Sequence, residues 1–234
     1  MGTTMEGYSL SKRLSCVADW IKDTGHRCVA DIGTDHGYLP VYLAKNNIAD
    51  RVIAMDVRKQ PLNKAESNVR LYGVQEKVEL RLSDGLDELK PLEADTITIC
   101  GMGGRLIQSI LTRGKDKYSE NTQIIVSPQS EIKEFRQFLV LAGYRVIREN
   151  FIKEDNQFYS IMDCRFNPEF ELYLRYGKDN LESRNQDMYQ YLNRELDTNL
   201  KILDTVTRAG ARERKAQVET ELYYIRRALE YYSD

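Results

Sequence analysis

The feature that most limits how this chain can fold is an alternation of short apolar runs with amphipathic segments between residues 28 and 143. Short apolar runs predict buried strands, and apolar residues spaced three and four apart predict helices. The predicted strands are 28–33, 51–57, 77–85, 94–104 and 122–129, and the predicted helices are 38–47, 60–73, 105–114 and 130–143. Repeated strand–helix units require a mostly parallel sheet with helices on both faces.

Two further apolar runs, 144–152 and 158–166, are separated only by the segment KEDNQ. This segment is too short for a crossover helix, so the two runs are predicted to pair antiparallel at the sheet edge. The helix before them, 130–143, is predicted to be capped by Ser130 and closed by Gly143. Together with the preceding units they make a seven-stranded, mostly parallel sheet with an antiparallel terminal hairpin.

A helix is also predicted before the first strand, over 10–23, where apolar residues form a stripe that ends before Gly25. Lys12 and Arg13 fall off the stripe and are predicted to face solvent. These two cations are therefore candidates for contact with a nucleic acid.

From residue 167 the pattern changes to helices alone. Asn167 and Pro168 read as the cap and first position of a short helix. Leucines at three- and four-residue spacing between 192 and 206, and again between 218 and 229, predict two helices that turn near Gly210. The narrow stripes suit an antiparallel coiled-coil hairpin. The predicted domains are therefore 1–166 and 167–234.

Composition excludes several classes of protein. The net charge is −2 and the pI is about 5.9, so bulk charge does not indicate nucleic-acid binding, and such a site must be a local patch. The four cysteines and two histidines lack zinc-ligand spacing, which argues against a metal. No apolar stretch is long enough for a membrane span. We expect a cytoplasmic protein with reduced thiols and without a metal or membrane partner.

The loop after the first predicted strand reads VADIGTDHGYLP, residues 29–40. Glycines between a strand and a helix bring backbone N–H groups close to a ligand. A dinucleotide site would carry G-x-G-x-x-G, whereas a methyltransferase site carries an acid followed by spaced glycines. The order Asp31, Gly33, Asp35 and Gly37 fits the second pattern, with Asp35 at the middle glycine position. Aspartate tolerates left-handed backbone, but a plain structural turn explains this loop as well.

Three later strand ends carry matching features. Asp56 can accept the hydroxyls of an adenosine ribose. Both NAD and S-adenosylmethionine contain this ribose, so Asp56 does not distinguish between the two cofactors. Asp84 and Gly85 could meet an adenine amino group or form an ordinary turn. The run of glycines at 101, 103 and 104 either admits a substrate to the backbone or allows tight helix packing. All of these features fall at carboxyl ends of strands, where open α/β sheets bind ligands.

Four segments together resemble the bacterial TrmK family of tRNA (adenine-22-N1)-methyltransferases: LSKRL, ADIGTDHGYLP, SDGL and ITICGMGG. The likeness covers roughly residues 9–165, and the helical tail agrees with the family's C-terminal coiled coil. It implies a class I, Rossmann-like, S-adenosylmethionine-dependent domain over 1–166. One departure concerns Ser127, Pro128 and Gln129, where family members more often carry a Gln-Pro-Asn-like turn.

The resemblance implies methyl transfer to N1 of an adenine in tRNA and a set of site residues. Cofactor contacts are expected from Asp31, Gly33, His36, Gly37, Asp56, Asp84, Gly85 and Gly101. The catalytic candidates are Asp35, Gly101, Met102 and Gly103, because acceptors facing the adenine amino group would stabilise the charge that develops during transfer. RNA binding requires basic groups, so the tRNA-binding candidates are Lys12, Arg13, Arg208, Arg212, Arg214 and Lys215, although a solvated helix surface explains each of them as well.

Other functions remain open from the residues alone. The domain could methylate a small molecule or a protein, or it could be a non-catalytic RNA-binding module that retains a cofactor fold. A dehydrogenase is opposed by the missing G-x-G-x-x-G. The helical hairpin could serve dimerisation instead of RNA binding, although we expect a monomer.

Overall fold

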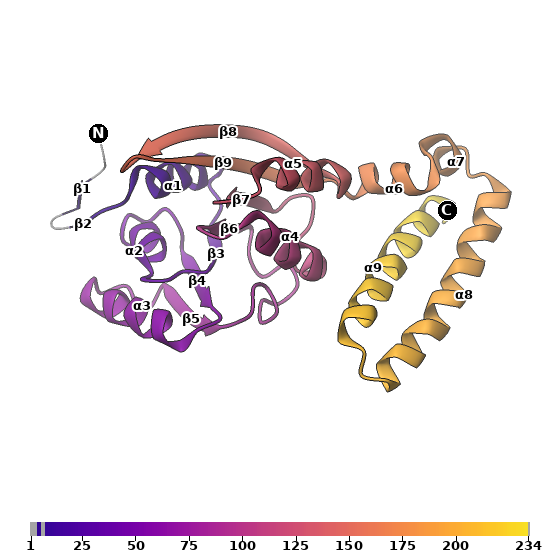
Figure 1. The fold of residues 1–234 in the computed structure, drawn as a ribbon, viewed down its shortest axis with the longest axis horizontal. Coiled ribbons are helices and arrows are strands. Elements are labelled where there is room, and N and C mark those ends of the chain that lie inside the picture. Colours follow the sequence, from indigo (N-terminus) through magenta and orange to yellow (C-terminus); the bar gives the residue numbers. More distant parts are fainter. Residues whose placement is uncertain (1–3, 6–7, 234) are drawn as a thin grey trace. The chain divides into compact units, whose positions relative to one another are not determined.

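The computed structural model describes residues 4–5 and 8–233, and the chain divides into two compact units, Met1–Phe166 and Asn167–Asp234 (Figure 1). The first described segments are the short strands β1 (Thr4–Met5) and β2 (Tyr8–Ser9), which pair with each other.

Within the described residues of the first unit, seven strands form one sheet in the order β5-β4-β3-β6-β7-β9-β8. The strands are β3 (Cys28–Ile32), β4 (Arg51–Asp56), β5 (Val78–Leu82), β6 (Thr96–Cys100), β7 (Gln123–Ser127), β8 (Tyr144–Glu154) and β9 (Gln157–Phe166). The first five are mutually parallel, and β9 and β8 run antiparallel at the edge. The predicted sheet is confirmed, and its chain order reverses between β3 and β6, where such sheets bind ligands.

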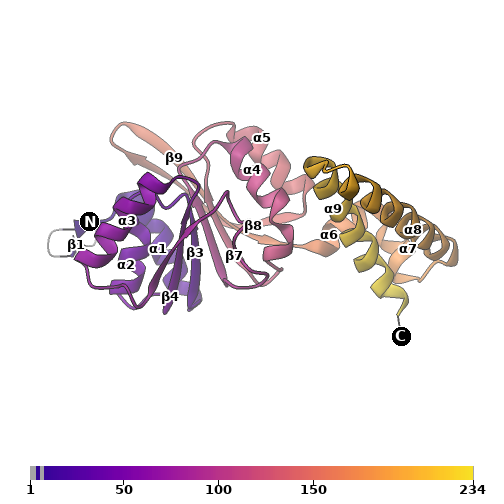
Figure 2. The same cartoon turned by 90° about the horizontal axis from the view of Figure 1, so that it is seen from below.

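Helices cover both faces of this sheet, as Figure 2 shows. One face carries α1 (Lys12–Thr24), α2 (Tyr38–Lys45) and α3 (Lys59–Leu71), and the other carries α4 (Gly104–Arg113) and α5 (Ile132–Leu141). A 3-10 turn, η1 (Lys115–Lys117), follows α4. The central strands are buried on both sides, which explains why they read as continuous apolar runs.

The terminal hairpin is longer than the sequence pattern predicted. Both Asp155 and Asn156 have left-handed backbone, with φ of 46° and 59°. They form a two-residue hairpin turn whose backbone twist matches the right-handed twist of the two strands. The flanking residues Glu154 and Gln157 pair with each other. The five-residue connection expected from KEDNQ is therefore wrong.

The start of α5 also differs from its prediction. The position before the helix is Glu131, with a left-handed φ of 55°, and no side chain caps the helix there. Ser130 instead accepts the N–H of Gly104 through its backbone carbonyl, at 3.1 Å. The Glu131 carboxylate accepts the N–H of Arg105 at 3.2 Å, so these two residues serve the start of α4 and the predicted Ser130 cap is wrong.

The second unit consists of helices, as predicted. They are α6 (Pro168–Tyr176), α7 (Lys178–Glu182), α8 (Gln186–Arg208) and α9 (Arg212–Leu229), followed by the 3-10 turn η2 (Glu230–Tyr232). Asn167 caps α6 by accepting the N–H of Glu169. The helices α8 and α9 pack against each other and turn at Gly210, whose φ is 67°. Leu192 on α8 and Leu222 on α9 are buried, but Leu200 is exposed, so the seam is only partly closed.

No helix in the described residues is both long and apolar enough to cross a membrane. Within that same part of the chain, no group of three or more histidine, cysteine or acidic side chains could hold a metal ion.

Candidate active site

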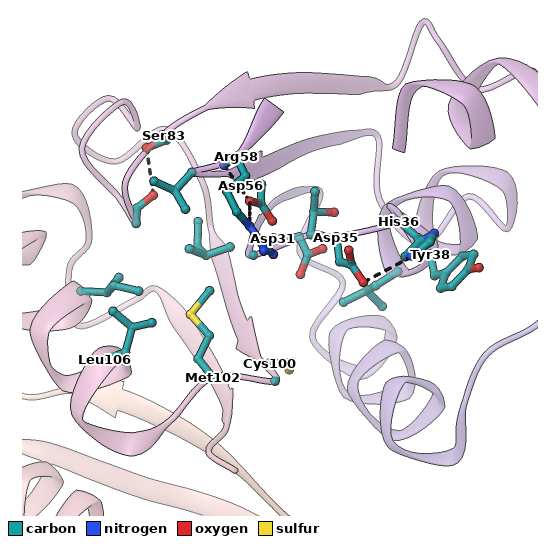
Figure 3. Close-up of a pocket in the computed structure, with 18 of the residues that line it drawn as sticks. Asp31, Asp35, His36, Tyr38, Asp56, Arg58, Ser83, Cys100, Met102 and Leu106 are labelled. Carbon is teal, nitrogen blue, oxygen red and sulfur yellow. Dashed lines mark hydrogen bonds and ion pairs between the residues drawn. The ribbon is translucent and has the colours of Figure 1, made fainter. Parts of the chain in front are cut away.

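A pocket of about 600 Å³ opens in the first unit at the carboxyl ends of β3, β4 and β6 (Figure 3). The loop that follows β5 also lines it. Its volume lies within the range of about 300–1,000 Å³ that small-molecule sites occupy. The pocket brings together ten residues singled out from the sequence: Arg13, Asp31, Gly33, Asp35, His36, Asp56, Asp84, Gly85, Gly101 and Met102.

The loop between β3 and α2 has the backbone that its pattern predicted. Gly33, Asp35 and Gly37 all have left-handed φ values, of 74°, 49° and 71°. Aspartate at the middle position therefore adopts a conformation that glycine would take more easily. Gly33 and Thr34 donate their N–H groups to the Met55 carbonyl, at 2.8 and 3.0 Å, which ties the loop to β4.

Gly37 does not line the pocket, although it was expected to contact a cofactor. A Cβ at this position would lie 2.9 Å from the Cβ of Ala65 on α3. Gly37 is therefore required for close packing of the start of α2 against α3. Its effect on the pocket is through the position of the loop.

We expect Gly37→Ala to destabilise the first unit by more than the roughly 1–2 kcal/mol that left-handed backbone costs a non-glycine residue. Gly73→Ala is the matched control, because Gly73 has a φ of 66° and nothing lies within 4 Å of its added Cβ. Urea unfolding of both variants separates the packing cost from the backbone cost. Equal losses of stability in the two would contradict the close-packing account.

Two further acids line the pocket: Asp56 is the last residue of β4, and Asp84 lies in the loop after β5. Asp56 is buried, and its Oδ1 accepts the N–H of Arg58 at 2.9 Å. A carboxylate has about four acceptor sites, so Asp56 retains capacity for ligand hydroxyls. Asp84 is half-exposed and is held by Arg113 on α4, with Nη2 to Oδ1 at 3.0 Å. Asp84 thus reaches the pocket with part of its carboxylate already occupied.

Asp31 is the penultimate residue of β3; it is buried and lines the pocket. Its Oδ1 accepts the hydroxyl of Thr98 on β6 at 2.6 Å. Burial raises the pKa of Asp31, and the hydrogen bond from Thr98 partly offsets that effect. A cationic ligand group beside Asp31 would favour its charged form.

The glycine run after β6 divides between two roles. Gly101, with φ of 86°, and Met102 line the pocket, and the side chain of Met102 lies against Gly33. Gly103 does not line the pocket. It precedes the first residue of α4, and a Cβ there would lie 2.9 Å from the Ser130 hydroxyl. Gly103 and Gly104 therefore allow close packing of the start of α4 against Ser130, whereas Gly101 faces the pocket.

Asp35 and His36 stand at one side of the pocket, as Figure 3 shows. The His36 Nε2 lies 3.6 Å from an Asp35 oxygen, and the His36 ring stacks on Tyr38, with centroids 5.2 Å apart. The Asp35 side chain is 63% exposed, which leaves its carboxylate accessible to a substrate.

Lys12 and Arg13 differ in solvent exposure, and the prediction that both face solvent is wrong for Arg13. Lys12 is exposed. Arg13 lines the pocket, with its Cζ 5.0 Å from the centre of the Tyr159 ring on β9. The sequence stripe could not show this, because Tyr159 is far away along the chain.

The other predicted cations, Arg208, Arg212, Arg214 and Lys215, lie in the second unit around the α8–α9 turn. Arg208 pairs with Asp204 at 2.7 Å and Lys215 with Glu219 at 3.6 Å, each one helical turn away. Arg212 and Arg214 are exposed. The charge available to a polyanion is thus smaller than the count of cations suggested.

Several lining residues were not singled out as site residues from the sequence: Leu14, Ile32, Thr34, Tyr38, Leu39, Val57, Arg58, Ser83, Cys100, Leu106 and Ile110. Most of them are next to a residue that was singled out. Their position beside a strand end was therefore the sequence signal that could have identified them as lining residues. Gln129, from the turn that departs from the family pattern, also lines the pocket. Leu106 and Ile110 come from the pocket side of α4, and helical spacing alone reads them as core. Burial raises the pKa of the Cys100 thiol to about 12, so this cysteine is protonated at neutral pH.

The fold and the pocket define the class of protein. A family model described as a methyltransferase domain matches residues 10–162. The chain therefore carries a methyltransferase domain. The tRNA (adenine(22)-N(1))-methyltransferase of Bacillus subtilis is 38% identical to it over 158 residues, which cover 68% of this chain and 66% of that protein.

Solved structures narrow the class to a family. The TrmK structure from M. capricolum, in complex with S-adenosyl-homocysteine, aligns with a TM-score of 0.61 at 30% identity, over 95% of this chain and 98% of that chain. TrmK from B. subtilis, an m1A22 tRNA methyltransferase, aligns with a TM-score of 0.63 at 28% identity, over 94% and 98%. The chain belongs to the TrmK family, as its motifs indicated.

Proposed function

We propose that this protein transfers the methyl group of S-adenosylmethionine to N1 of adenine 22 in tRNA. The observation that carries the proposal is the pocket itself, built from Asp31, Asp56 and the glycine loop at the strand ends of a TrmK-family domain. The 38% identity to a tRNA (adenine(22)-N(1))-methyltransferase supports the choice of substrate.

The residues present fit the methyl donor. The pocket is large enough for a nucleoside joined to an amino acid. In this proposal Asp56 accepts the ribose hydroxyls, and Asp84 with Gly85 borders the adenine edge; all three residues line the pocket. Gly33 and Gly101, both with left-handed backbone, also line the pocket. Bound S-adenosylmethionine would supply a methyl group activated by its sulfonium.

The chain's own contribution to the reaction is alignment and charge stabilisation. Adenine N1 carries an in-plane lone pair and needs no general base before attack. Alignment of reacting atoms alone can contribute several kcal/mol to lowering the barrier. Positive charge develops on the adenine during transfer, so acceptors at its amino group favour the transition state. We assign this role to the accessible Asp35 carboxylate and to the backbone at Gly101 and Met102, and we leave out Gly103.

The target adenine must also leave its stack before N1 is exposed. Lys12 and the α8–α9 turn, with Arg208, Arg212, Arg214 and Lys215, are the proposed contacts to the rest of the tRNA. We further propose that the enzyme acts in the cytoplasm as a monomer, without a metal or a membrane partner. Sedimentation equilibrium would measure its mass.

The test of the function is methyl transfer from labelled S-adenosylmethionine to an unmodified tRNA transcript with adenine at position 22, beside a guanine-22 control. Label recovered as 1-methyladenosine from the adenine transcript alone is the expected result. Equal label on both transcripts would place the methyl group elsewhere. No label on either, with cofactor bound, would point to a small-molecule or protein substrate.

Removal of the second unit tests its role in RNA binding. A chain ending at Phe166 is expected to bind tRNA at least about tenfold more weakly, because phosphate contacts are lost, and to keep its affinity for S-adenosylhomocysteine. Filter binding and calorimetry measure the two affinities. A full-length variant with Arg212 and Arg214 changed to glutamine controls for misfolding of the shortened chain. Unchanged tRNA affinity in both proteins would contradict this role.

A further inference from the structure

The hairpin of β8 and β9 extends beyond the sheet at the edge where the pocket opens. The pairing of β9 with β7 ends at Met162 and Val126, and Val126 is the penultimate residue of β7. Residues 157–160 of β9 therefore continue past the carboxyl end of β7, and Figure 2 shows the hairpin projecting beyond the neighbouring strands. Tyr159 lies in this projecting part, and Arg13 of the pocket wall lies over its ring. The projecting hairpin is thus continuous with the candidate active site.

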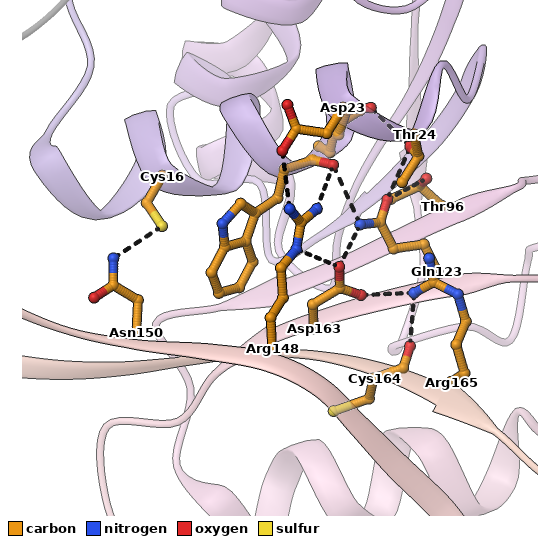
Figure 4. A network of polar contacts seen from close by, with 12 residues as sticks. Cys16, Asp23, Thr24, Thr96, Gln123, Arg148, Asn150, Asp163, Cys164 and Arg165 are labelled. Atoms are coloured by element: carbon orange, nitrogen blue, oxygen red, sulfur yellow. Dashed lines mark hydrogen bonds and ion pairs between the residues drawn. The ribbon is translucent and has the colours of Figure 1, made fainter.

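One face of this hairpin is held against α1. Alternate residues of β8 make the contacts, because successive side chains of a strand point to opposite faces. Figure 4 shows the Arg148 guanidinium donating to the Trp20 carbonyl at 3.0 Å. Asn150 donates to the Cys16 sulfur at 3.6 Å, and Ile152 packs against the apolar core. The residues between these three on β8 therefore point away from α1.

The face that points away from α1 carries two exposed phenylalanines. Phe151 on β8 is 69% exposed, and Phe158 on β9 is 61% exposed. Their ring centroids lie 5.6 Å apart, and the ring planes are 10° from parallel. Lys153 is the cross-strand partner of Phe158, and its Nζ lies 5.7 Å from the centre of that ring. We call this surface, made of Phe151, Lys153 and Phe158, the aromatic platform.

We propose that the aromatic platform stacks an unpaired nucleobase of the RNA substrate, from a nucleotide next to the adenine that is methylated. The inference rests on the proposed function and adds a contact outside the pocket. An adenine that leaves its stack to expose N1 also leaves a neighbouring base without its stacking partner. An exposed aromatic ring replaces that partner, since every base has a face that stacks on such a ring. Lys153 then contacts the adjacent phosphate.

A second protein chain is the competing occupant, and the size of the aromatic platform argues against it. A phenylalanine side chain buries about 150–250 Å² at most. Two of them offer well under the roughly 800 Å² per partner that a stable protein interface buries. Charged side chains border the platform, namely Glu149, which pairs with Arg136, and the exposed Asp155 at the turn. A small apolar surface with a charged rim suits one flat base better than a protein surface.

The test replaces both rings by leucine, which keeps the side chains apolar but removes the stacking faces. In the full-length Phe151→Leu/Phe158→Leu variant, the KM for a tRNA transcript with adenine 22 is expected to rise at least about fivefold, with kcat little changed. Its affinity for S-adenosylhomocysteine, measured by calorimetry, is expected to equal that of the wild type. Ile147→Ala is the matched control, because Ile147 is an exposed apolar residue of β8 farther from the turn, and it should leave both quantities unchanged.

Two further variants separate stacking from phosphate contact. Phe158→Trp places an indole in the aromatic platform, and its fluorescence is expected to fall when tRNA binds, beyond any change that Trp20 gives in the wild type. Lys153→Gln is expected to reduce the salt dependence of tRNA binding by about one phosphate contact. The leucine variant should keep the wild-type salt dependence, because stacking releases no counterions.

An unchanged KM in the leucine variant, or no added quenching in Phe158→Trp, would overturn the proposal and leave the proposed function standing. A wild type that sediments as a dimer, with a leucine variant that sediments as a monomer, would also overturn it and assign the aromatic platform to a second copy of the chain. Equal losses of tRNA and S-adenosylhomocysteine affinity in the leucine variant would count against it as well. Absence of methyl transfer by the wild type would instead refute the proposed function.

Discussion

Asp56→Ala is expected to abolish measurable binding of S-adenosylmethionine. Asp56 is the buried acid at the end of β4, and its carboxylate keeps acceptor capacity beyond the Arg58 N–H. Hydrogen bonds to a charged group contribute about 1.5–3 kcal/mol each. Loss of two of them at the ribose therefore weakens binding by at least about 100-fold. Calorimetric titration with S-adenosylmethionine and S-adenosylhomocysteine measures the change.

Two further variants make this result interpretable. Asp50→Ala removes an exposed acid that directly precedes the opposite end of β4, so cofactor binding should stay at the wild-type value. Asp56→Asn retains an acceptor for the Arg58 N–H and should fall between wild type and alanine. Normal cofactor affinity in Asp56→Ala, with the fold intact by circular dichroism, would refute the placement of the ribose.

Asp163→Ala is expected to destabilise the first unit by about 3 kcal/mol. Asp163 is 2% exposed and accepts from three side chains: Gln123 at 2.8 Å, Arg148 at 3.0 Å and Arg165 at 2.6 Å. Removing one partner of a buried charge network leaves the others uncompensated, at a cost of about 3–5 kcal/mol. The lower value applies because both arginines reach solvent in part.

Trp20 makes this change observable. It is the only tryptophan of the chain, and the Arg148 guanidinium lies 4.8 Å from its ring. The urea midpoint followed by Trp20 fluorescence should therefore fall in Asp163→Ala. Glu149→Ala on β8, which removes an exposed pair with Arg136, should change stability by less than about 1 kcal/mol. A similar midpoint for the two variants would show that the buried network contributes little.

Much of the architecture could be predicted from local pattern. Strand and helix periodicity depends on neighbours within a few residues. The predicted alternation of strands and helices and the helical tail were therefore confirmed. The acids at Asp31 and Asp56 were predictable because ligand sites of such sheets gather at strand ends. The left-handed Asp35 followed from its place in a spaced-glycine pattern.

Other features depended on contacts that no local pattern contains. Ser130 reads as a cap by composition, but Glu131 adopts left-handed backbone to reach the start of α4. The tight turn at Asp155 and Asn156 is the exception: its residue types favour left-handed backbone, so a local signal was present and was not used. Gln129 enters the pocket because its backbone N–H bonds to the Met102 carbonyl at 2.9 Å, far away in sequence.

The sequence by itself determined the alternation of elements, the acids and glycines at their ends, and the family to which the chain belongs. Only the tertiary structure decided that Arg13 enters the pocket while its neighbour Lys12 stays exposed. The physical reason is that a helix pattern specifies which face is apolar, but the direction of a long polar side chain depends on what lies beside it. Here that neighbour is Tyr159, brought across by the antiparallel hairpin.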